Sequence, residues 1–187
     1  MKPLDDYANV ITRIDEVEAQ QAWWLGNMLW DLLHPQSVID WGCASGLYLL
    51  PFKDKGIDVF GIDGEITAGG KLADNEFQRW DIREYVPTAH YDLALCIEVG
   101  EHLQPEYADV LVENVTRSAD EVFWSAARPG QGGHCHYNVQ PISYWAAKFA
   151  RHDFTLHPYN WQMIDSIVRS GMCVGWLRRN TRLYERL

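Results

Sequence analysis

Cysteine is scarce in this sequence, and its spacing shows no paired motif. Four cysteines occur in 187 residues, and none forms a CxxC pair. This excludes a disulfide-rich secreted scaffold and a cysteine-rich structural zinc site. Cys43 and Cys96 lie in apolar runs that are typical of buried strands. We therefore expect free thiols in a reducing compartment.

Long hydrophobic runs are also missing. The most apolar stretch, residues 22–33, is interrupted by Asn27 and Asp31 and is too short to span a bilayer. The N-terminus has no basic start followed by an apolar segment, and the chain has no lipidation motif, internal repeat or low-complexity tract. These absences predict a cytoplasmic protein with no membrane segment.

Basic residues are outnumbered. Sixteen Lys and Arg stand against 26 Asp and Glu, which gives a formal charge of −10. Such a balance disfavours broad binding to nucleic-acid phosphates. We interpret the one basic run, residues 178–182, as the solvent-exposed part of a hairpin at the edge of the sheet. We expect no nucleic-acid partner.

Apolar and aromatic residues are abundant, at 47% and 13% of the chain. This is enough for a sizeable core, and the length suits a single domain over residues 1–187. The hydrophobic periodicity predicts helices over residues 10–33, 47–55, 66–73, 105–118 and 143–151. It predicts strands over residues 37–41, 57–62, 77–80, 91–97 and 121–126, and a closing hairpin over residues 172–184 with a turn near Asn180.

Alternating strands and helices indicate an α/β fold with a mostly parallel sheet and helices on both faces. Acidic residues end the first four predicted strands: Asp40, Asp63, Asp81 and Glu98. In an open α/β sheet a ligand binds beyond the carboxyl ends of the strands, so these side chains should converge on one crevice.

A glycine turn follows the first predicted strand. Gly42 and Gly46 allow a tight turn and a close approach of backbone to ligand, and the next helix N-terminus favours an anionic group. Asp63, at the end of the second strand, is placed to accept hydrogen bonds from a ribose diol. The pattern indicates an adenosine-like ligand.

Four segments together resemble class I S-adenosylmethionine-dependent methyltransferases: residues 38–46, 61–63, 81–82 and 91–94. The resemblance implies a Rossmann-like, seven-stranded, mostly parallel sheet with an antiparallel last strand. It also implies that S-adenosylmethionine is the cofactor. The residues carried over to the cofactor site are Asp40, Gly42, Cys43 and Gly46 near the methionine end, Asp63 and Gly64 near the ribose, Asp81 and Ile82 near the adenine, and Glu98.

The glycine turn departs from the family at one position. Ala44-Ser45 replaces the common Gly-Xaa. An alanine at the position of a third glycine is expected to need a negative φ, with a shift of the loop.

The run Glu98-Val99-Gly100-Glu101-His102 brings two carboxylates and an imidazole to the end of the fourth strand. Oxygen ligands with one histidine suit Mg²⁺ or a similar divalent cation. This Glu-Xaa-Xaa-Glu-His motif resembles quinone-biosynthesis O-methyltransferases and small-RNA 3′-end 2′-O-methyltransferases, in which it binds a divalent metal. The resemblance implies a metal site of Glu98, Glu101, His102 and His136. Many methyltransferases carry Glu-His-Leu here without a metal, and His102 is then the general base.

The segment after the fifth predicted strand is rich in glycine. Its Pro-Gly-Gln-Gly-Gly, His, Asn and Tyr-Trp pattern resembles a subgroup of small bacterial and phage-type methyltransferases. Gln131, His136 and Asn138 offer polar contacts, and Tyr144 and Trp145 offer flat walls, which suits a lid over the acceptor. The alternative is a plain connector with Tyr144 and Trp145 in the core.

We therefore expect a methyltransferase that methylates an oxygen of a small polar or aromatic acceptor, with Glu101, His102 and His136 as catalytic residues. Residues 1–35 would form a helical prologue, 36–127 the cofactor-binding half, and 128–187 the acceptor-side loop and closing hairpin. The alternatives are an RNA 3′-end 2′-O-methyltransferase and a non-catalytic partner protein that binds S-adenosylmethionine or a nucleotide.

Overall fold

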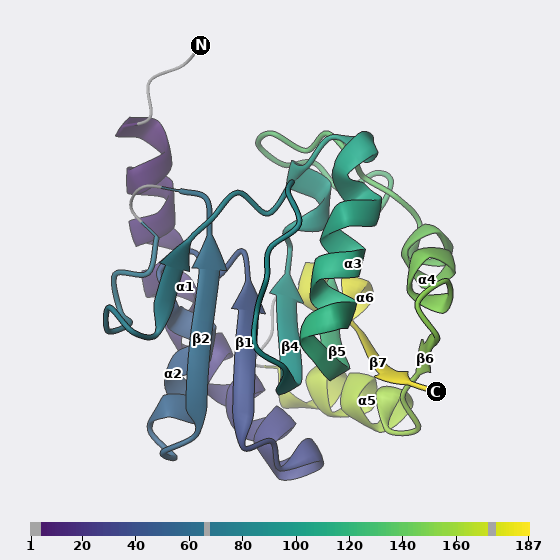
Figure 1. Cartoon of the computed structure of the whole chain (residues 1–187), viewed down its shortest axis with the longest axis horizontal. Coiled ribbons are helices and arrows are strands. Elements are labelled where there is room, and N and C mark those ends of the chain that lie inside the picture. The colour runs from purple at the N-terminus through teal and green to yellow at the C-terminus, as the bar shows by residue number, and fades with distance from the viewer. Residues whose placement is uncertain (1–4, 66–67, 172–174) are drawn as a thin grey trace.

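The computed structural model describes residues 5–65, 68–171 and 175–187, and these form an α/β structure around one seven-stranded sheet (Figure 1). The strand order is β3-β2-β1-β4-β5-β7-β6. The first five strands in this order run parallel, and β7 is antiparallel to both β5 and β6. This confirms the predicted fold class. The strands are β1 (Ser37–Trp41), β2 (Asp58–Asp63), β3 (Phe77–Arg79), β4 (Tyr91–Ile97), β5 (Ala119–Ser125), β6 (Phe154–Leu156) and β7 (Arg182–Arg186).

Helices cover both faces of the sheet. They are α1 (Asp5–Leu33), α2 (Leu50–Lys53), α3 (Ala108–Ser118), α4 (Ile142–Ala150), α5 (Asn160–Ser170) and α6 (Gly175–Asn180). Three short 3₁₀ turns join them: η1 (Leu47–Leu49), η2 (Gly100–His102) and η3 (Pro105–Tyr107). Among the described segments, no helix combines the length and the hydropathy needed to cross a membrane.

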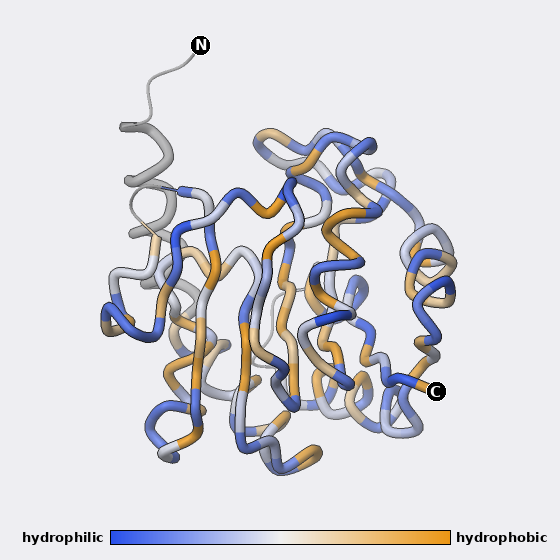
Figure 2. The backbone as a smooth tube through the Cα atoms, viewed as in Figure 1, coloured by the Kyte–Doolittle hydropathy of each residue, from blue (hydrophilic) through white to orange (hydrophobic). Residues whose placement is uncertain are grey.

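The sheet has a separate hydrophobic core on each face. Alternate residues of β4 enter the two cores, with Ala94 and Cys96 facing α3 and α4, and Leu93 and Leu95 facing α1, α2 and α5. Because both faces are covered, the central strands carry apolar runs, interrupted by Asp40 in β1 and Asp92 in β4, and Figure 2 shows these runs in orange. The apolar runs explain why β1 and β4 have the predicted bounds.

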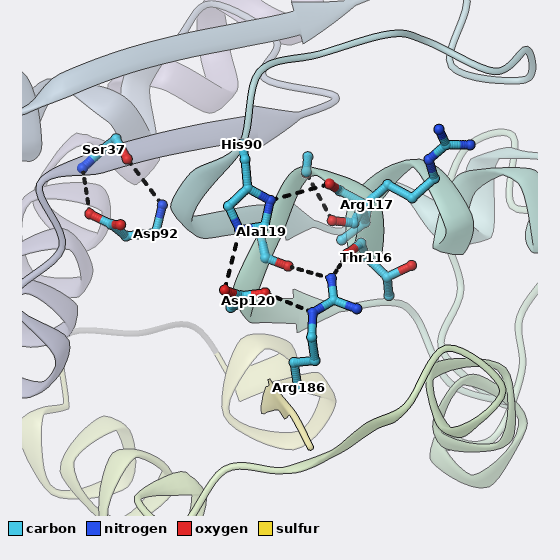
Figure 3. A network of polar contacts seen from close by, with 10 residues as sticks. Ser37, His90, Asp92, Thr116, Arg117, Ala119, Asp120 and Arg186 are labelled. Atoms are coloured by element: carbon cyan, nitrogen blue, oxygen red, sulfur yellow. Dashed lines mark hydrogen bonds and ion pairs between the residues drawn. The ribbon is translucent and has the colours of Figure 1, made fainter.

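A polar network closes the edge of the sheet where β4 and β5 begin (Figure 3). The Asp92 carboxylate accepts a hydrogen bond from the Ser37 backbone N–H at 3.1 Å, and the Ser37 hydroxyl accepts one from the Asp92 N–H at 3.0 Å. Arg186 of the last strand donates to Asp120 at 2.7 Å and to the Thr116 carbonyl. The bonds of Arg186 tie β7 to α3 and β5.

The predicted closing hairpin is wrong. Residues 172–174 lie outside the described residues, and the next six form α6 rather than a strand. The antiparallel partners of β7 are β5 and β6, and both precede α5 in the chain. The physical reason is burial: Leu177 packs in the core and Asn180 is 2% exposed, so neither suits an exposed turn.

Two predicted helices also differ. The helix over residues 47–55 is a 3₁₀ turn followed by the four-residue α2, and Gly56, with φ +74°, follows its end. Residues 68–72 of the predicted helix over residues 66–73 form turns, and residues 66–67 lie outside the described part. Gly69, with φ +76°, donates to the Ala44 carbonyl at 2.6 Å, which holds this segment against the glycine turn. The strand β6 and the helix α5 were not predicted.

Candidate active site

The turn after β1 brings backbone to the carboxyl edge of the sheet. Gly42 has φ +76°, and its N–H donates to the Ile62 carbonyl of β2 at 2.8 Å. A Cβ at this position would lie 2.5 Å from Cγ2 of Val99. Gly46 has φ +88°, and a Cβ there would lie 2.6 Å from Cγ of Leu72. Both glycines are therefore required by conformation and by packing.

Ala44 does not take the negative φ expected from the sequence. Its φ is +47°, in the left-handed region that favours glycine. Two hydrogen bonds hold it there: its N–H donates to Asp63 at 2.9 Å, and its carbonyl accepts from Gly69 at 2.6 Å. The loop keeps its turn because these bonds offset the strain of the alanine.

The acids of β1 and β2 lie close together in a buried region. Asp40 is 2% exposed, and burial together with the charge of Asp63 raises the pKa of Asp40 to about 8. Burial also raises the pKa of Asp63, although N–H groups of Glu65 and Ala44 oppose the shift. Burial therefore favours the neutral form of Asp40, and a positively charged group bound beside it would shift this carboxyl towards its ionised form.

A cavity of about 540 Å³ opens at the ends of β2 and β3. It is lined by Gly64, Gln78, Arg79, Trp80 and Asp81. Two of these, Gly64 and Asp81, are residues that the sequence assigned to the cofactor, whereas Gln78, Arg79 and Trp80 were not named. Trp80 packs against the hydrophobic core and also lines this cavity. The position of these three residues at the end of the third predicted strand could have indicated them from the sequence.

Asp81 is held by an ion pair, and Ile82 is held by packing in the core. Asp81 forms a two-point ion pair with Arg83, with 2.6 Å between Oδ2 and Nη2, and this pairing lowers the pKa of Asp81. Ile82 is 8% exposed and packs in the core beneath α3. Of the two, only Asp81 lines the cavity, and Ile82 lies in the hydrophobic core.

Glu98 follows β4 and is held by two distant amides. It has φ +53°, an unusual conformation for a residue other than glycine. Its carboxylate oxygens accept hydrogen bonds from Nδ2 of Asn180 at 3.0 and 3.2 Å and from Nε2 of Gln131 at 3.2 Å. Asn180 was missed as a site residue because its role depends on a contact across 82 positions of the chain.

Glu101, His102 and His136 form a cluster beside Glu98. One ligand atom from each of the three residues lies within 4.8 Å of the others. The Oε1 atom of Glu101 accepts a hydrogen bond from the Ala127 N–H at 2.9 Å. Its Oε2 atom and the Nδ1 atom of His136 are buried and have no hydrogen-bond partner among the described residues. Such orphaned buried atoms, from one carboxylate and one imidazole, fit a divalent cation.

The backbone of the glycine-rich loop carries His136 into this cluster. The N–H groups of Tyr137 and Asn138 both donate to the Glu101 carbonyl, at 2.7 and 3.0 Å. A Cβ on Gly133 would lie 2.1 Å from Cε1 of His136, so only glycine leaves room for the ring. Of the four residues that the sequence assigned to a metal, the structure therefore places three in one group and Glu98 beside it.

Charge and burial set the ionisation of the cluster. Burial and the nearby Glu98 raise the pKa of Glu101 to about 8. Burial and the neighbouring His136 lower the pKa of His102. The Nδ1 atom of His102 lies 3.3 Å from the Cys135 carbonyl, which can only accept, so Nδ1 carries the proton. The neutral ring then presents the lone pair of Nε2.

The aromatic walls expected of a lid are packed inward. Trp145 is 2% exposed and packs against Trp124 in the core with the two rings tilted by 50°, and Tyr144 packs edge to face with Trp145. A Cβ on Gly100 would lie 2.8 Å from Trp145, so this tryptophan supports η2 from below. The structure favours the connector alternative for these two side chains.

Comparison with known proteins identifies the family. Residues 21–117, about half of the chain, match the family model described as a methyltransferase domain. No curated protein gives a significant sequence match.

Solved structures share the fold at low sequence identity. Magnesium protoporphyrin IX methyltransferase from Synechocystis PCC 6803, with bound S-adenosylmethionine, is 17% identical, with a TM-score of 0.66 over 96% of this chain and 85% of that one. The sugar N-methyltransferase KedS8 from Streptoalloteichus is 12% identical, with a TM-score of 0.69 over 95% and 92%. The methyltransferase domain of a bacterial CtHen1-C is 17% identical, with a TM-score of 0.61 over 91% and 98%. The chain belongs to the methyltransferase domain family and is a class I S-adenosylmethionine-dependent methyltransferase.

Proposed function

We propose that this methyltransferase methylates an oxygen atom of a small polar or aromatic acceptor, with a divalent cation held by Glu101, His102 and His136. The observation that carries the proposal is the orphaned, buried Oε2 of Glu101, which lies in one group with two imidazoles. Mg²⁺ or a similar ion, when bound, would lower the pKa of an acceptor hydroxyl that contacts it.

The residues around the cluster would position the reactants. Asp40 would lie near the methionine end of the cofactor and Asp63 near its ribose, and the cavity lined by Gly64 and Asp81 would take the adenine. Glu98 has its oxygens occupied by Asn180 and Gln131, so we assign it to positioning rather than to the metal. We further propose that residues 36–127 form the cofactor half and residues 128–187 the acceptor half of one domain, in a cytoplasmic enzyme.

A mechanism without a metal ion would use the same residues. The lowered pKa of His102 keeps its ring neutral near physiological pH, and the lone pair on Nε2 accepts the proton of the acceptor hydroxyl. Proton removal and positioning are then the whole contribution of the protein, because the sulfonium already carries a good leaving group.

An RNA 3′-end acceptor is the second candidate. It is supported by His136, which completes the set as the later histidine does in the RNA enzymes that the motif resembles. The formal charge of −10 weighs against it, because a strand needs a basic path. A non-catalytic role is disfavoured by the intact cluster next to an intact cofactor turn.

Manganese binding tests the proposal directly. We expect the protein with bound S-adenosylhomocysteine to bind Mn²⁺, as measured by electron paramagnetic resonance, and Glu101→Gln and His136→Ala to weaken binding at least about tenfold. His134→Ala is the matched control, since His134 is exposed in the same loop and lies outside the group. Mn²⁺ binding that is absent, or unchanged in Glu101→Gln, would overturn the metal site and leave His102 as the base. Methyl transfer from labelled S-adenosylmethionine to a panel of hydroxylated aromatics and to an RNA oligonucleotide then decides the acceptor class.

A further inference from the structure

Arginines gather where the acceptor half meets the end of β5. Arg128 follows β5, Arg178 and Arg179 lie in the last turn of α6, and Arg182 begins β7. Nη1 of Arg128 lies 3.5 Å from the Arg179 carbonyl, which joins the loop to the helix. Arg182 pairs with Trp124 of β5 across the sheet. The basic run therefore forms the end of α6 and the start of β7 rather than a hairpin edge, and its Arg182 lies close enough to Arg128 for their charges to interact. We refer to Arg128 and the three arginines of this run as the arginine cluster.

These four guanidinium groups have no acidic partner among the residues that the structure describes. Elsewhere Arg83, Arg117 and Arg169 each pair with a carboxylate. Arg182 is partly buried, and burial together with the charge of Arg128 lowers its pKa. Nη1 of Arg182 donates to the Thr181 carbonyl and Nη1 of Arg128 to the Arg179 carbonyl, so these two cations meet neutral acceptors but no carboxylate. A bound anion would offset the repulsion between them.

The arginine cluster adjoins the candidate active site directly. Arg128 follows Ala127, whose N–H donates to Glu101 at 2.9 Å. Arg179 and Arg182 flank residues 180 and 181, and Asn180 donates to Glu98 at 3.0 Å. Arg128 and Arg182 thus lie one and two residues along the chain from groups that contact Glu101 and Glu98.

We propose that Arg128 and Arg182 bind an anionic group of the acceptor, a carboxylate or a phosphate. This inference rests on the proposed function, since it specifies the acceptor of that same site. The planar guanidinium fork matches both anions. A small molecule is favoured over a nucleic-acid strand because the cationic charge is confined to one point of a chain whose formal charge is −10.

The test follows the guanidinium signals of the protein with bound S-adenosylhomocysteine. We would label arginine with ¹⁵N and titrate with inorganic phosphate and, separately, with benzoate at low ionic strength. We expect saturable shifts of the Arg128 and Arg182 Nε–H signals with a millimolar dissociation constant, weakened at least about tenfold in Arg128→Gln and in Arg182→Gln. The stronger of the two probes identifies a phosphate or a carboxylate. Arg169→Gln is the control, because it removes the same charge from α5, where Arg169 pairs with Asp165.

Two results would overturn the proposal. Shifts that do not saturate, or that are equal in Arg128→Gln, Arg182→Gln and Arg169→Gln, would show that the cluster does not select an anion. Binding of a single-stranded RNA oligonucleotide far tighter than that of phosphate, with a salt dependence equivalent to several phosphate contacts, would replace the small acceptor with a strand. Binding of S-adenosylhomocysteine is measured separately in each variant, so a failure of the proposed function is distinguished from a failure of the anion site.

Discussion

At the scale of single residues, the site contains an acid whose charge the fold disfavours. Asp40 is almost completely buried next to Asp63, and its pKa in the folded protein is raised from 3.8 to about 8. Near neutral pH the native state therefore binds a proton that the unfolded chain releases. The stability that this proton contributes is fully present below the unfolded pKa and is lost as the pH rises through the folded pKa.

Asp40→Asn should therefore stabilise the cofactor-free protein more at high pH than at low pH. We expect the free energy of unfolding of Asp40→Asn, relative to the wild type, to rise by at least about 1 kcal/mol between about pH 5 and about pH 8.5. Urea unfolding at the two pH values measures it, and the same change at the exposed Asp54 is the control. A difference that is independent of pH would show that Asp40 is ionised throughout. The variant should also bind S-adenosylhomocysteine more weakly.

Alanine variants at Gly42 and Gly56 distinguish the cost of a steric clash from the cost of a positive φ. Both have a positive φ, +76° and +74°, but a Cβ on Gly42 would meet Val99 at 2.5 Å, whereas a Cβ on Gly56 would meet nothing within 4 Å. We expect Gly56→Ala to cost about 1 kcal/mol of unfolding free energy, and Gly42→Ala about 1–3 kcal/mol more. Urea unfolding of the two variants checks this, and equal losses would mean that Val99 moves aside without cost.

At the scale of elements, the parallel strands β1 to β5 could be predicted from the sequence, whereas β6, α5 and α6 could not. Strands such as β4 are apolar on both faces because helices cover both, so their bounds can be read from the sequence. The strand β6 has three residues, of which only Phe154 is buried, and such a segment gives no periodic signal. The helix α6 has six residues and is defined by packing of Leu177.

The same limit applies to the candidate site. Asp40, Asp63 and Glu98 could be named from the sequence because each ends or nearly ends a strand of the parallel half. The partners of Glu98 could not, because Gln131 and Asn180 reach it from segments that come together only in the fold. The arginine cluster was missed for the same reason, since Arg128 lies about fifty positions before the basic run.

Asn180 links the acceptor-side loop, α6 and the end of β4. Its amide donates to Glu98 and, at 3.0 Å, to Oε1 of Gln131. Asn180→Ala should cost about 1.5–3 kcal/mol, because it removes a donor from a carboxylate. Urea unfolding measures the loss, and Asn75→Ala, at an exposed turn, should stay within about 0.5 kcal/mol of the wild type. A loss at Asn180 no larger than that of the control would show that water replaces the amide and that the link is not structural.

At the scale of the whole molecule, charge is divided between two regions. The overall charge is −10, and the carboxyl ends of the strands combine buried acids of β1 and β2 with arginines near the end of β5 and the start of β7. Under the proposals above, the cofactor would bind beside Asp40 and Asp63, and an anionic acceptor near Arg128 and Arg182. The network of Figure 3 lies at the other end of the strands, where β4 and β5 begin.

Calorimetric titration with S-adenosylhomocysteine tests the account most directly, because it needs no acceptor. It should be done with excess Mg²⁺ or Mn²⁺ and again after chelation. We predict a micromolar dissociation constant, weakened in Gly42→Ala, and a metal-dependent heat that Glu101→Gln abolishes. The absence of binding under all of these conditions would contradict the assignment of the carboxyl edge of the sheet to the cofactor.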